Sequence, residues 1–407
     1  MPFTGEGNYS VSDAGGGDVD IASGIGDAGI VTFDGGTYSI GASFVAGRNL
    51  AGSTPFSGGV RLTNATQMTF APGAGQRATV YVGENVSDAA STDQIVAYGY
   101  LDIHDGSTLA VAYTAPENPT GAYAYASFVV GGTAGASAQV SVDGAGSALS
   151  ASGPSNRVSL GLGGGLGSLV VTGSGRAEML SLLAGAAGGL GQVYVSGAGS
   201  EVVVSSATGQ YLDPAYAGQG GSALFGVTGG GGFLGITGGG RFVAENVDGQ
   251  TDLATARLGI DAAAYGYALI TGSGSELAVT QHGAQGDDFD GGAVLTVGEG
   301  GQGVLLAANH GRISITGDGA RLNIASGRSV GGAPANTDAE SRVEISGGAQ
   351  LTIDSQGYGG TQTVDGMTQA DGRGGARDCR RARDPWSADC RRRGLCRRGD
   401  QRSARCR

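Results

Sequence analysis

Residues 267–279 read YALITGSGSELAV, and closely similar stretches recur along the chain. Residues 192–204 read QVYVSGAGSEVVV and residues 312–324 read RISITGDGARLNI. Related copies are QVSVDGAGSAL at 139–149, LVVTGSG at 169–175, LGITGGGRFV at 234–243, VEISGGAQLTI at 343–353 and LDIHDGSTLAV at 101–111. A motif that recurs along most of a chain is typical of a repeat architecture, in which each copy forms one structural unit.

Each copy has two short segments of alternating apolar residues, one on either side of a glycine-rich turn. In residues 267–279 the apolar pairs are Ala268/Ile270 and Leu277/Val279, with TGSG between them. Alternation with a period of two predicts strands with one buried face, and glycine allows the positive φ of a tight turn. The apolar residues that flank the turn are six or seven positions apart, and the copy at 169–180, which ends in RAEML, breaks this register.

A second glycine precedes most copies and predicts another corner of the chain. It follows an apolar run and lies 12 or 13 residues before the turn glycine, at Gly131, Gly161, Gly185, Gly226 and Gly259. The intervals between successive turn glycines range from 24 to 45 residues, which is typical of a solenoid with variable inserts. If the shortest interval is one coil, residues 1–360 form roughly 15 coils and a rod on the order of 70 Å long.

The sequence therefore predicts an all-β chain that folds as a right-handed parallel β-helix. A β-propeller is the alternative, because its blades also repeat about every 40–45 residues, but a closed ring fits such uneven intervals poorly. We expect residues 1–80 to form an N-terminal cap and the first coils, and residues 81–360 to form the repeat array. Residues 361–407 are expected to be a disordered tail.

This tail differs from the rest of the chain in composition. Residues 371–407 hold 13 arginines and the one tryptophan, Trp386, together with all four cysteines, Cys379, Cys390, Cys396 and Cys406. GC-rich codons for Gly, Ala and Val, translated one base out of frame, give such a mixture, so we hypothesise that the reading frame is lost near residue 370. The alternatives are a basic disordered tail and a zinc site, although the cysteine spacings match no paired C-x2-C pattern.

The charge of the chain excludes several classes of function. Residues 1–370 carry 11 Arg and 31 Asp and Glu (net −20), and residues 371–407 carry 13 Arg and 5 Asp (net +8), which sums to −12. All 24 basic residues are arginine, so a Walker-A loop and lysine Schiff-base chemistry are excluded. An acidic body of this kind argues against nucleic-acid binding. The sequence contains neither a secretory signal pattern nor 18 consecutive apolar residues, so we expect no transmembrane segment and an export signal outside this chain.

The pattern V-G-x(10–11)-V-[ST]-G-x-G-[SA]-x-L-x-V, over about residues 80–360, resembles the repeats in passenger regions of bacterial autotransporter adhesins. It equally resembles large secreted repeat proteins that carry calcium-binding nonapeptides and use type I secretion. The calcium motif itself is not matched, because GGLGQVYVS at 188–196 has Gln192 where the aspartate stands. The resemblance implies a β-helical passenger or stalk located outside the cell or at the outer membrane, with the export route left open between the two groups.

The sequence predicts no enzymatic activity. His104 and His310 lie at or beside expected turns, His282 is the third histidine, and no G-x-S-x-G elbow opens a helix. The alternative is an enzyme that acts on a polysaccharide along the rod, which would need carboxylates on neighbouring coils and aromatic platforms.

Two kinds of candidate ligand residue stand out in the inserts. No cofactor is expected, with calcium as the one alternative left open. Asp287, Asp288 and Asp290 lie close together and are its candidate ligands, because calcium binds clustered carboxylate oxygens. A similar cluster is Asp13, Asp18 and Asp20, and both clusters have solvated loops as the competing interpretation. The candidate ligand-contact residues are the tyrosines of the two largest inserts, Tyr113, Tyr123, Tyr125, Tyr211 and Tyr216.

We therefore expect a structural and adhesive function. The repeat core would form a rigid rod, and its loops would contact a host or sister-cell surface, a matrix or a glycan. A solenoid that ends within its array leaves a sheet edge able to pair, so self-association through an uncapped edge is also expected. A calcium-dependent secreted repeat protein is a further alternative.

Overall fold

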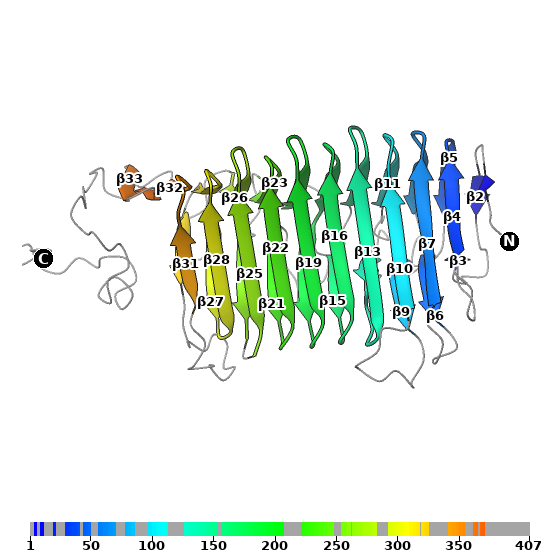
Figure 1. The fold of residues 1–407 in the computed structure, drawn as a ribbon, viewed down its shortest axis with the longest axis horizontal. Coiled ribbons are helices and arrows are strands. Elements are labelled where there is room, and N and C mark those ends of the chain that lie inside the picture. The colour runs from blue at the N-terminus through cyan, green and yellow to red at the C-terminus, as the bar shows by residue number, and fades with distance from the viewer. Residues whose placement is uncertain are drawn as a thin grey trace, which may run out of the picture.

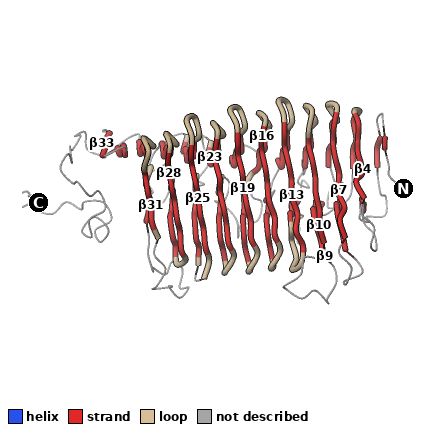
Figure 2. The backbone as a smooth tube through the Cα atoms, in the orientation of Figure 1, coloured by secondary structure: helices blue, strands red, loops and turns tan. Residues whose placement is uncertain are grey.

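The computed structural model describes sixteen segments between residues 4 and 354 and two short segments beyond them. They are residues 4–5, 9–11, 19–21, 29–40, 44–49, 56–70, 78–85, 97–112, 126–152, 157–206, 221–247, 254–261, 263–282, 292–317, 319–324, 341–354, 361–364 and 367–370. Their secondary structure is β-strand joined by short turns, which lie at the ends of the strands in Figure 2.

Successive strands join three sheets in turn, here called sheets A, B and C. Sheet A has, in spatial order, β1 (Thr4–Gly5), β4 (Gly29–Asp34), β7 (Phe56–Thr63), β10 (Ala97–Ile103), β13 (Ala136–Asp143), β16 (Leu166–Thr172), β19 (Leu190–Ser196), β22 (Gly231–Thr237), β25 (Tyr265–Thr271), β28 (Gln302–Ala308) and β31 (Arg342–Ile345). Sheet B has β2 (Tyr9–Val11), β5 (Thr37–Ile40), β8 (Gln67–Phe70), β11 (Thr108–Ala112), β14 (Ala148–Ser152), β17 (Arg176–Met179), β20 (Glu201–Ser205), β23 (Arg241–Asn246), β26 (Glu276–Gln281), β29 (Arg312–Thr316), β32 (Gln350–Asp354), β34 (Met367–Ala370) and β33 (Thr361–Val364). Sheet C has β3 (Val19–Ile21), β6 (Phe44–Asn49), β9 (Ala78–Asn85), β12 (Ala126–Val130), β15 (Arg157–Leu162), β18 (Ser181–Ala186), β21 (Ser222–Val227), β24 (Thr255–Ile260), β27 (Val294–Glu299) and β30 (Arg321–Ile324).

These three sheets make the chain a right-handed parallel β-helix. Among the described strands, each one pairs in parallel with the strand one coil before or after it, and the β33–β34 hairpin is the exception. The sheet A strands lie side by side along the long axis of the molecule in Figure 1, from β4 near one end to β31 near the other. Parallel strands joined by crossovers favour the right-handed path. The β-propeller alternative is wrong, since blades of antiparallel hairpins would give no all-parallel ladders of this length.

The core is built from equivalent apolar positions that repeat in every coil. In sheet A, alternation sends one row inward that includes Ile103, Val142, Val171, Val195 and Ile236, and each of these side chains is fully buried. Sheets B and C contribute similar rows to one continuous hydrophobic cluster. Because each coil buries its inward face only between its neighbours, stacking is the source of stability.

The predicted turn lies between sheets A and B. The glycines of the TGSG motif have positive φ, with Gly272 at 95° and Gly274 at 81°. The buried Ser275 hydroxyl accepts a hydrogen bond from the Gly239 amide of the preceding coil at 3.0 Å. Ser147 does the same for the Gly106 amide at 3.1 Å. The serine thus satisfies a backbone donor that the tight turn leaves without a strand partner.

The second predicted corner lies between sheets C and A. Gly161 and Gly185 have φ of 63° and 74°. A Cβ on Gly185 would lie 1.8 Å from the Gly231 carbonyl oxygen, and one on Gly161 would lie 2.0 Å from that of Leu190. The same close approach occurs at Gly131, Gly226 and Gly259. The corner therefore requires glycine both for its conformation and for its space.

The copy at 169–180 keeps the register, and the expectation of a break there is wrong. Ala177 of β17 pairs with Leu149 on one side and Val202 on the other, and Ala177 and Met179 are both fully buried. The small Ala177 occupies an inward position that the neighbouring coils fill with larger side chains. The motif was obscured by residue size, not by a shift of the strand.

The copy at 312–324 lies at a different corner from the other copies. Its first strand, β29, belongs to sheet B and pairs with β26, and its second strand, β30, belongs to sheet C. The turn between sheets A and B in this coil is formed instead by Asn309 and His310, with φ of 49° and 66°. Asparagine tolerates the left-handed conformation, so this corner carries no glycine signature in the sequence at those two positions.

The number of coils is also corrected. Sheet A has 11 described strands, one per coil, so the intervals of 24 to 41 residues between Gly106 and Gly272 are single coils with longer or shorter inserts. The interval of 45 residues from Gly272 to Gly317 is longer than one coil because Gly317 lies at the corner between sheets B and C. Eleven coils at 4.8 Å correspond to a rod of roughly 50 Å, not 70 Å.

The described strands run across the proposed domain boundaries. The boundary at residue 80 falls within β9, and the first nine strands already follow the A, B, C order. In the segment expected to be a tail, β33 and β34 form a hairpin, and β34 pairs with β32. Residues 371–407, with the four cysteines, lie outside the described residues.

Candidate functional site

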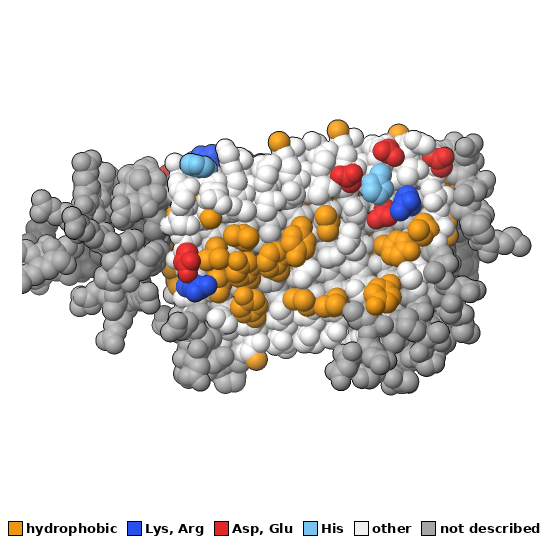
Figure 3. Space-filling model, in the orientation of Figure 1, with side chains coloured by type: hydrophobic (Ala, Val, Ile, Leu, Met, Phe, Trp, Pro, Cys, Tyr) orange, Lys and Arg blue, Asp and Glu red, His pale blue; other side chains and the backbone are white. Residues whose placement is uncertain are grey.

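The outer face of sheet A carries a series of large apolar side chains. Alternation directs every second residue outward, and from β16 to β28 many of these are large and apolar but only partly buried. Hydrophobic side chains form a band across the middle of this face in Figure 3, with charged groups near its ends. The band includes Leu166, Val170, Leu190, Tyr194, Phe233, Tyr267, Leu269 and Leu306.

Three aromatic side chains in this band, Tyr194, Phe233 and Tyr267, form what we call the aromatic row. The ring centroids of Phe233 and Tyr267 are 5.2 Å apart and the rings are nearly parallel, at 8°. Tyr194 and Phe233 are 5.1 Å apart with a tilt of 42°. Gly235 lies beside them, where a Cβ would come within 3.0 Å of both Tyr194 and Phe233. The row is thus held by contacts between three successive coils.

The aromatic row also changes the acidity of one phenol. Partial burial raises the pKa of Tyr267 above its ordinary value, and the neighbouring Tyr265 raises this pKa further. Tyr267 therefore stays uncharged across the neutral range, which suits contact with an apolar partner.

A hollow of about 410 Å³, here called the tyrosine hollow, opens nearer the N-terminal end of the same face. Its lining residues are Ser57, Tyr98, Gly99, Tyr100, Asp102, Ser137, Ala138, Gln139 and Ser168, from β7, β10, β13 and β16. Tyr98 is 41% exposed, and the Tyr100 ring lies over the backbone of Gly59, where a Cβ would come within 2.0 Å of it. The hollow thus combines aromatic and polar side chains.

Charged groups border the hollow on one side. Arg61 of β7 forms an ion pair with Asp102 of β10 at 3.2 Å. His104, in the turn after β10, lies 3.9 Å from both Asp102 and Asp143. The Arg61–Asp102 pair joins neighbouring coils and fixes the carboxylate at the rim of the hollow.

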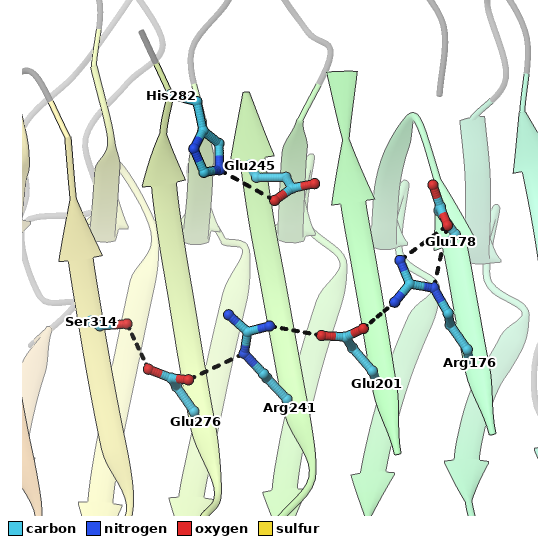
Figure 4. Close-up of polar contacts among 8 residues, drawn as sticks. All are labelled: Arg176, Glu178, Glu201, Arg241, Glu245, Glu276, His282 and Ser314. Atoms are coloured by element: carbon cyan, nitrogen blue, oxygen red, sulfur yellow. Dashed lines mark hydrogen bonds and ion pairs between the residues drawn. The ribbon is translucent and has the colours of Figure 1, made fainter. Parts of the chain in front are cut away.

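The outer face of sheet B has a different character. Arg176, Glu201, Arg241, Glu276 and Arg312 occupy the same register position on five successive coils and alternate in charge. Figure 4 shows this Arg–Glu ladder from Arg176 to Glu276, in which Arg241 lies 2.8 Å from Glu201 and 3.2 Å from Glu276. Arg176 pairs with both Glu178 and Glu201. A row in which every charge has opposite neighbours is better suited to stabilising the stack than to binding a ligand.

One of the ligand residues predicted from the sequence lies in the described part of the chain: Asp20 is in β3, opposite Val45 of β6. The predicted calcium ligands Asp287, Asp288 and Asp290 lie outside the described residues, as do Asp13, Asp18, Tyr113, Tyr123, Tyr125, Tyr211 and Tyr216. The described residues contain no group of three or more His, Cys, Asp or Glu side chains that could hold a metal ion. Calcium binding therefore stays a prediction.

Two of the histidines, His104 and His310, lie at or beside turns, as the sequence predicts. His104 follows β10, and His310 lies in the turn between β28 and β29. His282 follows β26, and its Nε2 lies 3.6 Å from Glu245 (Figure 4). The three histidines come from separate places on the rod, after β10, after β26 and between β28 and β29. None of the described elements is a helix long and apolar enough to cross a membrane.

The tyrosines of sheet A are not among the ligand residues predicted from the sequence, because that prediction rested on the tyrosines grouped in the two largest inserts. The motif Tyr-Gly-Tyr occurs at 98–100 and again at 265–267, and both copies occupy the same rows of sheet A. Their alternation is out of phase with the inward Leu101 and Ala268, which indicates outward side chains. The alternation of inward and outward positions along each strand is therefore enough to predict that these tyrosines point outward.

Comparisons with known proteins add little to this description. No family model matches the chain, and no curated protein matches it. Among solved structures the chain is similar to a TibC-catalyzed hyper-glycosylated TibA fragment, with 15% identity over 84% of this chain and 100% of that chain and a TM-score of 0.18. A TM-score this low supports no argument, so the assignment of the fold rests on the strand ladders.

Proposed function

We propose that the chain is an adhesive rod of a bacterial cell-surface or secreted protein and that it attaches to its partner through the outer face of sheet A. The observation that carries this proposal is the apolar band with its aromatic row on one face of a regular stack. Contiguous exposed apolar surface is uncommon on soluble proteins and marks interaction sites. The resemblance of the repeats to those of autotransporter adhesins agrees with this proposal.

The architecture is better suited to binding a partner than to catalysing a reaction. Stacked coils fix the outward side chains at a spacing of about 4.8 Å, so a partner meets a preformed surface and little conformational entropy is lost on binding. Tyrosine and phenylalanine contribute large contact areas with few rotatable bonds. The aromatic row is therefore the expected centre of the contact.

The test is attachment of the purified chain to bacterial cells, extracellular matrix and immobilised copies of itself at micromolar concentration. Replacing Tyr194, Phe233 and Tyr267 together with serine is expected to lower attachment by at least 10-fold. A control triple variant on sheet B, with Gln67, Arg312 and Gln350 replaced by serine, changes three exposed strand residues on a different face and is expected to bind normally.

Two other outcomes would overturn the proposal. Equal attachment by both triple variants, each shown to be folded by circular dichroism, would show that the aromatic row is not the contact. Release of soluble sugar from a polysaccharide in the absence of attachment would favour the enzyme alternative instead.

A further inference from the structure

The tyrosine hollow has an aromatic floor that its neighbours hold in place. The Cδ2 and Cε2 atoms of Tyr100 lie 2.0 and 2.3 Å from the position of a Cβ on Gly59, so the ring occupies space that only glycine leaves free. Its hydroxyl lies 3.4 Å from the Ser57 hydroxyl, also on β7. The ring therefore lies along β7, with Tyr98 exposed beside it. Such a surface can pack against the apolar C–H face of a flat ring.

Polar groups capable of directional hydrogen bonds surround this floor. The Asp102 carboxylate is 17% exposed and accepts from the Arg61 guanidinium at 3.2 Å, which leaves acceptor capacity on its oxygens. Gln139 is exposed, and its side-chain amide takes part in none of the hydrogen bonds among the described residues. An amide and a carboxylate together offer donors and acceptors to neighbouring hydroxyl groups.

The charge of the hollow selects between classes of ligand. Arg61 offsets the charge of Asp102, so the lining is close to neutral and offers little attraction to a cationic side chain. Asp143 lies beyond His104 on the same side and would repel an anionic group such as a phosphate or a uronic acid. The volume of about 410 Å³ is at the small end of ligand pockets, which span roughly 300–1,000 Å³.

We infer that the tyrosine hollow is a binding subsite for a neutral carbohydrate of one or two sugar rings. One sugar ring stacks on Tyr100, and its hydroxyl groups bond to Asp102 and Gln139. This deepens the proposed function, on which it rests for the role of the sheet A face, because it names a ligand class for one part of that face. The hollow and the aromatic row are separate sets of residues, so each can be altered alone.

The experiment is saturation-transfer NMR with the full chain and a set of neutral probes: glucose, galactose, mannose, N-acetylglucosamine, maltose, lactose and chitobiose. At least one probe is expected to bind with a millimolar or lower Kd. Tyr100→Ala is expected to weaken sugar binding by at least 10-fold and Tyr100→Phe by no more than about 2-fold, since the ring face carries the stacking energy. Gln139→Ala, which removes hydrogen bonds to the sugar, is expected to weaken binding by several-fold. Tyr194→Ala, a matched loss of an aromatic ring outside the hollow, is expected to bind sugar normally.

Several results would overturn the inference. Absence of binding by every probe, or equal binding by Tyr100→Ala with its fold intact, would show that the hollow is not a sugar subsite. Binding of N-acetylarginine amide that Asp102→Asn abolishes, with no sugar bound, would identify a cation site. These failures differ from failure of the proposed function, because attachment that depends on the aromatic row would persist while sugar binding was absent.

Discussion

Gly185 and Gly188 have almost the same backbone conformation but different surroundings. Their φ angles are 74° and 79°. A Cβ on Gly185 would lie 1.8 Å from the Gly231 carbonyl oxygen, whereas one on Gly188 would meet nothing within 4 Å. Another residue at position 185 would both strain the backbone and clash with the neighbouring coil, whereas another residue at position 188 would only strain the backbone.

Alanine substitution at the two positions should separate these effects. Gly188→Ala is expected to lower the free energy of unfolding by about 1–2 kcal/mol, the cost of a left-handed non-glycine residue. Gly185→Ala should cost about 1–3 kcal/mol more, because neighbouring coils must move apart. Urea denaturation measures both, and equal losses would contradict the close packing of the corner between sheets C and A.

The Arg–Glu ladder shows how one row of a sheet supports the alignment of the coils. Arg241 is 46% exposed and lies between Glu201 and Glu276, which are 19% and 20% exposed. Exposed ion pairs contribute only about 0–1 kcal/mol each. Their larger effect is on register, because a strand shifted by one residue would place these charges on the inward face.

Reversing one charge should reveal the ladder's contribution. Glu201→Arg would place three guanidinium groups on successive coils and is expected to lower stability by roughly 1–2 kcal/mol at low salt, with most of the loss removed at high salt. Glu201→Gln should cost less than about 1 kcal/mol. The control is Glu344→Gln, whose side chain is 55% exposed and should have almost no effect. A loss for Glu201→Arg that salt does not change would point to packing instead of charge.

The whole molecule is a stack in which each coil contacts only its neighbours. Leu162 pairs with Ala186 and Leu166 with Leu190, so residues 163–186 make up one complete coil of 24 residues. Removing this coil joins Leu162 to Ala187 at equivalent positions. The stability of such an array is approximately a sum of units and their interfaces.

Deletion of residues 163–186 is therefore expected to give a folded chain with the same circular dichroism signature. Its denaturant m-value should fall by roughly a tenth, because m scales with the surface exposed on unfolding. Deletion of residues 163–174 removes the sheet A strand of that coil and should prevent cooperative folding. If both deletions behaved alike, the one-coil-per-interval assignment would be wrong.

The sequence by itself determined the fold class and two of the corners. Alternating apolar residues around YALITGSGSELAV specify strands buried on one face, and Gly185 and Gly272 specify positive φ. These are local properties, since side-chain direction and backbone sterics depend on near neighbours in the chain. The prediction of an adhesive rod came from the resemblance of the repeats and stays a proposal.

Only the tertiary structure decided which sheet each copy joins and which outward side chains meet. RISITGDGARLNI has the same local pattern as the other copies, yet the pairing of β29 with β26 places it at the next corner. The contacts between Tyr194, Phe233 and Tyr267 likewise join residues of three coils. The physical reason is that strand register between coils is set by pairing across inserts of variable length, which no local periodicity encodes.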